Sequence, residues 1–132
     1  MKALKVSTNN VREVVNFTNE TSYETIRDAV NGWIECIPLP SLGVDMWINE
    51  EGKLSNELVQ NPTATALWYD NYGPTDVTIG NVIFTGGTDA EGKTLGLTDA
   101  QLKALLAYDE SVFIADLDIN KYLGFTITTF DN

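Results

Sequence analysis

Apolar and polar residues alternate at the start of the chain in a pattern that predicts a β-hairpin. Two short runs with strand-like alternation, residues 3–7 and 11–17, flank the tripeptide Thr8-Asn9-Asn10. Asparagine tolerates the left-handed backbone that a tight hairpin turn requires. We therefore predict two antiparallel strands at the N-terminus.

Apolar residues then recur with helical spacing over residues 23–30, which predicts an amphipathic helix with one buried face. Thr21 and Glu24 match a capping box, in which each side chain accepts a free backbone N–H at the helix start. Asn31-Gly32 supplies a left-handed residue that ends the helix.

Two further strands are predicted over residues 33–39 and 44–49, joined by a short turn. Apolar residues break the alternation in 33–39, so we expect that strand, which contains Cys36, to be buried on both faces. Asn61-Pro62 predicts the start of a short helix that ends near Trp68 and is followed by a polar, aromatic loop over 69–74. Residues 76–85 carry the next strong strand pattern.

A second main helix is predicted from Thr98 to about Tyr108. Thr98 and Gln101 match a capping box, and Leu97 and Leu102 hold the positions of a hydrophobic staple. Residues 109–132 differ in composition and favour one or two further strands at an edge of the sheet. An exposed apolar edge invites pairing, so a homodimer is a further expectation.

Together these patterns predict an α+β fold. A central, mostly antiparallel sheet is packed by two main helices, which begin near Thr21 and Thr98, and a β-rich C-terminal extension follows. With 132 residues the chain is long enough for one domain. We divide it into a domain over 1–108 and a C-terminal extension of the same domain over 109–132.

The chain carries a formal net charge of −11, from 19 acidic and only 8 basic side chains. So few cations disfavour direct nucleic-acid binding and attachment to an anionic membrane. Three interpretations of the charge remain: solubility in an acidic proteome, a partner protein with a basic patch, or mimicry of a nucleic acid's charge. No run of about 18 apolar residues occurs, the N-terminus has no apolar signal core, and a lone Cys36 suits the cytoplasm.

The chain contains no histidine, which removes the usual proton shuttle and most zinc sites. Cys36 therefore has no histidine base and is interpreted as a small core residue. Asp116, Asp118 and Asn120 copy the first half of a calcium loop, but Lys121 stands where glycine is required. We expect no metal, no cofactor and no enzymatic activity.

Four aromatic residues gather in the middle of the chain: Trp47, Trp68, Tyr69 and Tyr72. Tryptophan and tyrosine combine a large contact area with a polar group, which suits a recognition surface. The same residues could instead cover the core, and composition does not separate the two interpretations. We predict these four as binding residues.

Several short motifs occur along the chain in an order that is similar to a known family. They are Val30-Asn31-Gly32-Trp33-Ile34-Glu35, Asn49-Glu50-Glu51-Gly52-Lys53-Leu54, Asn61-Pro62, Ile79-Gly80-Asn81-Val82-Ile83-Phe84 and Leu97-Thr98-Asp99-Ala100-Gln101-Leu102. Their order resembles the family called domain of unknown function 3846, whose small members occur in bacteriophages, plasmids and bacteria. The resemblance covers roughly residues 1–108 and supplies no catalytic residues. It implies an accessory protein of a phage or mobile element that acts in a bacterial cytoplasm.

These observations lead to one functional expectation and two alternatives. The expectation is a non-enzymatic binding protein of a phage or mobile element that modulates a host or defence protein through an acidic, aromatic surface. One alternative binds or sequesters a nucleotide signal, with aromatic rings stacked on the base and the amides of Gly86 and Gly87 against the phosphate. The other alternative is a DNA mimic.

Overall fold

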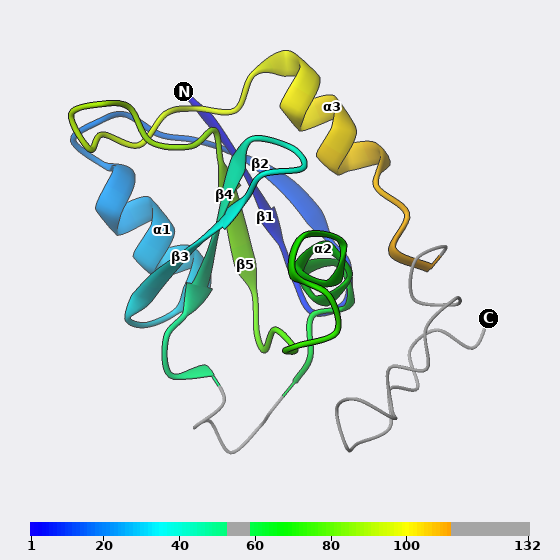
Figure 1. Ribbon diagram of the computed structural model, residues 1–132. Helices are drawn as coiled ribbons and strands as arrows, with labels where there is room; N and C mark the ends of the chain where they lie inside the picture. The colour runs from blue at the N-terminus through cyan, green and yellow to red at the C-terminus, as the bar shows by residue number, and fades with distance from the viewer. Residues whose placement is uncertain (53–58, 112–132) are drawn as a thin grey trace.

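The structure, a computed structural model, describes residues 1–52 and 59–111, which form the predicted α+β fold (Figure 1). Its sheet has five strands in the order β2-β1-β5-β4-β3, and every neighbouring pair is antiparallel. The elements in chain order are β1 (Lys2–Val6), β2 (Arg12–Asn16), α1 (Ser22–Val30), β3 (Ile34–Leu39), β4 (Val44–Asn49), α2 (Pro62–Tyr72), β5 (Val82–Thr85) and α3 (Asp99–Ala107).

Helices cover both faces of the sheet (Figure 1). One face packs against α1 in a cluster of Ala3, Phe17, Ile26, Ala29, Val30 and Ile83. The other face packs against α2 and α3 in a larger cluster of Leu4, Val6, Ile37, Leu39, Val44, Met46, Ala64, Leu67, Val82, Phe84, Leu97 and Leu105. The two predicted main helices are therefore present as α1 and α3, and α2 shares a face with α3.

The predicted hairpin is confirmed as β1 and β2, with Asn10 in the left-handed region at a φ of 65°. The prediction that residues 33–39 are buried on both faces is wrong. β3 is an edge strand in which Glu35 and Pro38 are exposed while Ile37 and Leu39 are buried. Cys36 is only partly buried for the same reason.

The capping box at Thr98 is confirmed, because the Thr98 hydroxyl accepts the Gln101 N–H and the Gln101 side chain accepts the Thr98 N–H. The capping box at Thr21 is wrong. Its hydroxyl accepts the N–H of Thr18 at 2.9 Å instead and makes no bond to the helix that it precedes. The predicted stop is confirmed, since Asn31 has a left-handed φ of 59°.

Two predicted boundaries shift because of packing. The predicted loop over residues 69–74 is wrong at its start, since α2 continues to Tyr72 with Tyr69 buried against the core. The strand predicted over 76–85 is shortened to β5, because Gly80 takes a left-handed φ of 85° and Ile79 bridges to Gln60. The strands predicted beyond residue 111 lie outside the described residues.

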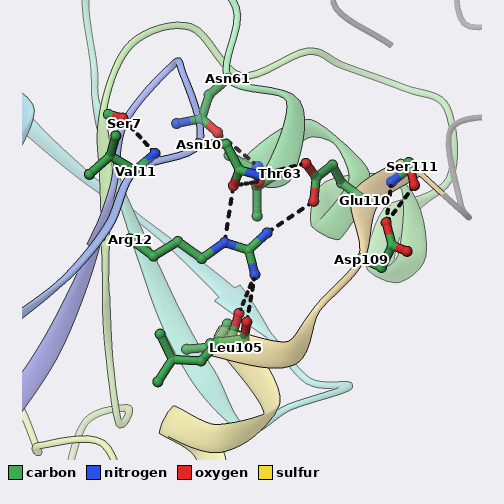
Figure 2. A network of polar contacts seen from close by, with 12 residues as sticks. Ser7, Asn10, Val11, Arg12, Asn61, Thr63, Leu105, Asp109, Glu110 and Ser111 are labelled. Carbon is green, nitrogen blue, oxygen red and sulfur yellow. Dashed lines mark hydrogen bonds and ion pairs between the residues drawn. The ribbon is translucent and has the colours of Figure 1, made fainter. Parts of the chain in front are cut away.

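A polar network joins the β1–β2 hairpin to the ends of α2 and α3 (Figure 2). The Arg12 guanidinium donates to the Leu105 carbonyl at 2.7 Å and pairs with the Glu110 carboxylate at 2.9 Å. The Asn10 side-chain oxygen accepts from Arg12 at 3.0 Å and from the Thr63 hydroxyl at 3.1 Å. These contacts hold both helices against the same end of the sheet.

Candidate functional site

The four predicted binding residues do not form one cluster. Trp47 lies on β4 with its side chain on the α1 face, where its indole N–H donates to the Thr85 hydroxyl at 2.9 Å. Trp68, Tyr69 and Tyr72 lie on α2 at the opposite face. Tyr69 is only 3% exposed and belongs to the core. A role in binding stays a prediction for all four.

Trp68 and Tyr72 form a pair at the C-terminal end of α2. Their ring centroids are 5.0 Å apart with the planes tilted by 50°. The Trp68 indole N–H donates to the Thr75 hydroxyl at 2.8 Å, and the Tyr72 hydroxyl donates to the Pro38 carbonyl of β3. These contacts tie α2 to the edge of the sheet and leave the Trp68 ring partly exposed.

Beside Trp68 lies a cleft of about 120 Å³ that we call the acidic cleft, lined by Glu35, Ile48, Asn49, Glu50, Gly52, Trp68, Asp76, Val77, Thr78 and Ile79. Three of its lining residues are carboxylates that come from separate parts of the chain. Glu35 lies opposite Ile48 in the β3–β4 register, which directs it to the face that carries α2. Glu50 follows β4, and its N–H donates to the Trp33 carbonyl at 2.8 Å.

The third carboxylate, Asp76, accepts a hydrogen bond from the residue that follows it. Its side-chain oxygen accepts the N–H of Val77 at 2.8 Å. A cleft lined by three carboxylates and an indole suits a cation on an apolar stem, because an aromatic ring face and acidic groups both attract positive charge. Within residues 1–52 and 59–111, no three His, Cys, Asp or Glu side chains gather closely enough to hold a metal ion. A lysine or arginine side chain has both features, a charged end and an apolar stem.

Cys36 does not provide a nucleophile under ordinary conditions. Partial burial, the negative charge of Asp45 and a hydrogen bond to Asp45 together raise the pKa of the Cys36 thiol to about 12. The Asp45 carboxylate is itself buried and accepts the Thr88 hydroxyl at 3.0 Å. At neutral pH the thiol is protonated, and its contacts are structural.

Sequence reasoning missed Glu35 and Asp76, which join Trp68 only after the sheet and α2 have packed. It also placed Trp33 in a buried strand, whereas the structure leaves that ring 65% exposed beside Tyr23. The run of Trp33, Ile34, Cys36 and Ile37 carries no local sign of which side chain faces water. The calcium-like residues after position 111 lie outside the described part of the chain.

The remaining observations concern membrane-spanning helices and the relatives of this chain. Among the residues that the structure describes, no helix has both the length and the apolar character to cross a membrane. A comparison with protein families matches the description "Domain of unknown function (DUF3846)" over residues 1–110. Comparisons with curated proteins and with solved structures found no match. Because the family match covers most of the 132 residues, the chain belongs to the DUF3846 family, as its motifs predicted.

Proposed function

We propose that this protein is a non-enzymatic binding protein of a phage or mobile element, and that it modulates a host or defence protein. The acidic cleft is the observation that supports this proposal. It combines Glu35, Glu50 and Asp76 with the Trp68 ring in a hollow of about 120 Å³. A lysine or arginine side chain of a partner inserts there, with its stem on the indole and its charge among the carboxylates.

The charge of the whole chain assists this contact. A net charge of −11 attracts a basic partner over distances near the Debye length and raises the rate of encounter. The cleft then supplies the short-range contacts that select a side chain. The proposed place of action is the bacterial cytoplasm, in keeping with the family resemblance and the lone cysteine.

A capture experiment tests the proposal. The immobilised protein is exposed to bacterial lysate at about 50 mM and about 500 mM salt, because screening at high salt weakens contacts between exposed charges. The variant Glu35→Gln/Asp76→Asn is expected to lose most of the protein retained at low salt. The matched variant Glu13→Gln/Glu20→Gln removes the same charge at exposed positions outside the cleft. This control variant is expected to retain the captured protein at low salt.

Two outcomes would count against the proposal. Retention that is the same at both salt concentrations would rule out steering by charge. Equal loss in the two double variants would show that net charge, and not the acidic cleft, determines binding.

The two alternatives remain separate proposals. One contact argues against the nucleotide alternative. The Gly86 N–H, which was expected to bind the phosphate, already donates to the Leu95 carbonyl at 2.8 Å. A thermal-shift panel of nucleotides tests it, since a ligand that binds the folded state raises the melting temperature. The DNA-mimic alternative predicts that duplex DNA displaces a captured partner.

A further inference from the structure

A second cleft, of about 240 Å³, lies at the C-terminal end of α1 and the start of β3. It is lined by Tyr23, Arg27, Gly32 and Trp33, and we call it the aromatic–arginine cleft. Tyr23 is 50% exposed and Trp33 is 65% exposed. The two exposed rings at one hollow offer a large apolar contact area to a ligand, since tyrosine and tryptophan combine such area with a polar group.

The backbone beneath this cleft is held firmly. Asn31 ends α1 in the left-handed conformation, and its N–H donates to the Arg27 carbonyl at 2.8 Å. The Asn49 side chain donates to the carbonyls of Val30 and Asn31 at 3.2 and 3.3 Å. The Trp33 carbonyl accepts from Glu50 at 2.8 Å. Trp33 is therefore presented to solvent from a rigid backbone, which reduces the entropy lost on binding.

Gly32 is required at the base of the cleft for a steric reason. A Cβ atom at Gly32 would come within 2.6 Å of the Asn49 side-chain nitrogen, which is the group that holds the end of α1. The close fit of Gly32 against Asn49 thus keeps Tyr23, Arg27 and Trp33 around one space.

Arg27 gives the cleft its chemical preference. Within residues 1–52 and 59–111 its guanidinium makes no ion pair or side-chain hydrogen bond. A guanidinium fork matches a carboxylate in a two-bond geometry, and the rings beside it stack on a planar group. Glu24 and Asp28 are exposed on the same helix and the chain carries a net charge of −11, which disfavours a ligand with several negative charges.

We propose that the aromatic–arginine cleft binds a planar aromatic group that carries a single carboxylate. The ring lies between Tyr23 and Trp33, and the carboxylate accepts hydrogen bonds from Arg27. This inference does not rest on the function proposed for the acidic cleft, and the two clefts share no lining residue.

An NMR titration of the full chain tests the proposal with four probes. N-acetylphenylalanine carries both the ring and the carboxylate. N-acetylphenylalanine amide, in which the carboxylate is a neutral amide, lacks the charge, and N-acetylalanine lacks the ring. Adenosine 5′-monophosphate carries a planar ring with a phosphate in place of the carboxylate. N-acetylphenylalanine is expected to bind saturably and to shift the Trp33 indole and Tyr23 signals. Removal of the charge or of the ring is expected to weaken binding about tenfold or more.

Variants connect binding to the cleft. Arg27→Gln and Trp33→Leu are each expected to weaken N-acetylphenylalanine binding about tenfold. The control Lys103→Gln, on α3, removes one positive charge elsewhere and is expected to leave the affinity for N-acetylphenylalanine unchanged. Denaturation midpoints show whether each variant is folded. The proposal is overturned if no probe saturates, if the neutral amide binds equally well, or if Arg27→Gln has no effect. Tighter binding of the nucleotide would overturn the assignment of a carboxylate.

Discussion

At the scale of single residues, Asn61 contributes most to the way the sheet and α2 meet. It is fully buried, and its side-chain oxygen accepts the Ala64 N–H at 3.1 Å at the start of α2. Its amide group donates to the carbonyls of Val6 and Gly80, both at 3.0 Å. One side chain thus caps a helix and satisfies two backbone carbonyls, while Pro62 at the first helical position needs no N–H partner.

Asn61→Ala is expected to lower the free energy of unfolding by about 3 kcal/mol, because it removes a helix cap and leaves buried backbone groups without partners. Urea denaturation measures the change. Asn19→Ala, at an exposed loop position, is the matched control and is expected to change stability by less than about 0.5 kcal/mol. Equal effects would contradict the role assigned to Asn61.

A second prediction at the scale of single residues concerns the thiol of Cys36, whose pKa is raised to about 12. At pH 8 its thiolate fraction in the folded protein is about a thousandfold smaller than that of an ordinary cysteine, so alkylation by iodoacetamide should be slower by a similar factor. The same chain unfolded in guanidinium chloride is the control. Asp45→Asn should speed the reaction in the folded protein only in part, because burial is the larger cause of the shift. Equal rates in the folded and unfolded chains would contradict the raised pKa.

At the scale of elements, α3 has no basic residue in its last turn, and the hairpin supplies one. Arg12, on β2, donates to the carbonyls of Leu105 and Leu106 at 2.7 and 3.2 Å. A positive charge at a helix C-terminus interacts favourably with the helix dipole and satisfies the last carbonyls. The position of α3 therefore depends on a residue at the other end of the described chain (Figure 2).

Arg12→Met is expected to destabilise the fold by about 2 kcal/mol, because Glu110 and the α3 carbonyls lose a partner that is largely shielded from water. A double-mutant cycle with Glu110→Gln, followed by chemical denaturation, isolates the ion pair. The coupling energy is expected to be about 1 kcal/mol or more. A value near zero would mean that Arg12 acts through the helix carbonyls alone.

The two threonines that precede α1 and α3 offer a matched comparison. Thr98→Ala removes a hydroxyl that accepts from Gln101 and should cost about 1 kcal/mol. Thr21→Ala removes a hydroxyl that makes no bond to α1 and should cost less. Thermal denaturation of the two variants measures the difference. A larger loss for Thr21→Ala would contradict the caps that the structure assigns.

At the scale of the whole molecule, the net charge of −11 affects stability as well as encounter with a partner. An excess of like charge repels itself more strongly when the chain is compact. An increase of sodium chloride from about 20 mM to about 300 mM, which screens exposed charges, should therefore raise the melting temperature. The variant Glu13→Gln/Glu20→Gln should show a smaller salt effect, since it carries two fewer negative charges. A melting temperature that falls with salt would indicate that attractive pairs dominate instead.

Most of the fold could be predicted because its signals are local. The Asn31 stop, the Thr98 capping box and the Asn10 turn each depend on residues within one or two turns of one another. The predictions were wrong where tertiary packing determines the burial of a strand or the end of a helix. Whether residues 33–39 lie at an edge depends on the strand order of the sheet, and the end of α2 depends on the burial of Tyr69.

The candidate sites were less predictable than the fold, and the reason is physical. The sequence alone determined most helix and strand types, the antiparallel pairs β1–β2 and β3–β4, and the excess of negative charge, since all of these follow from short-range pattern and composition. Only the tertiary structure decided that Trp47 and Trp68 lie on opposite faces and that Trp33 faces solvent. It also brought Glu35 and Asp76 together beside Trp68, because such contacts require the whole sheet to form before distant residues can meet.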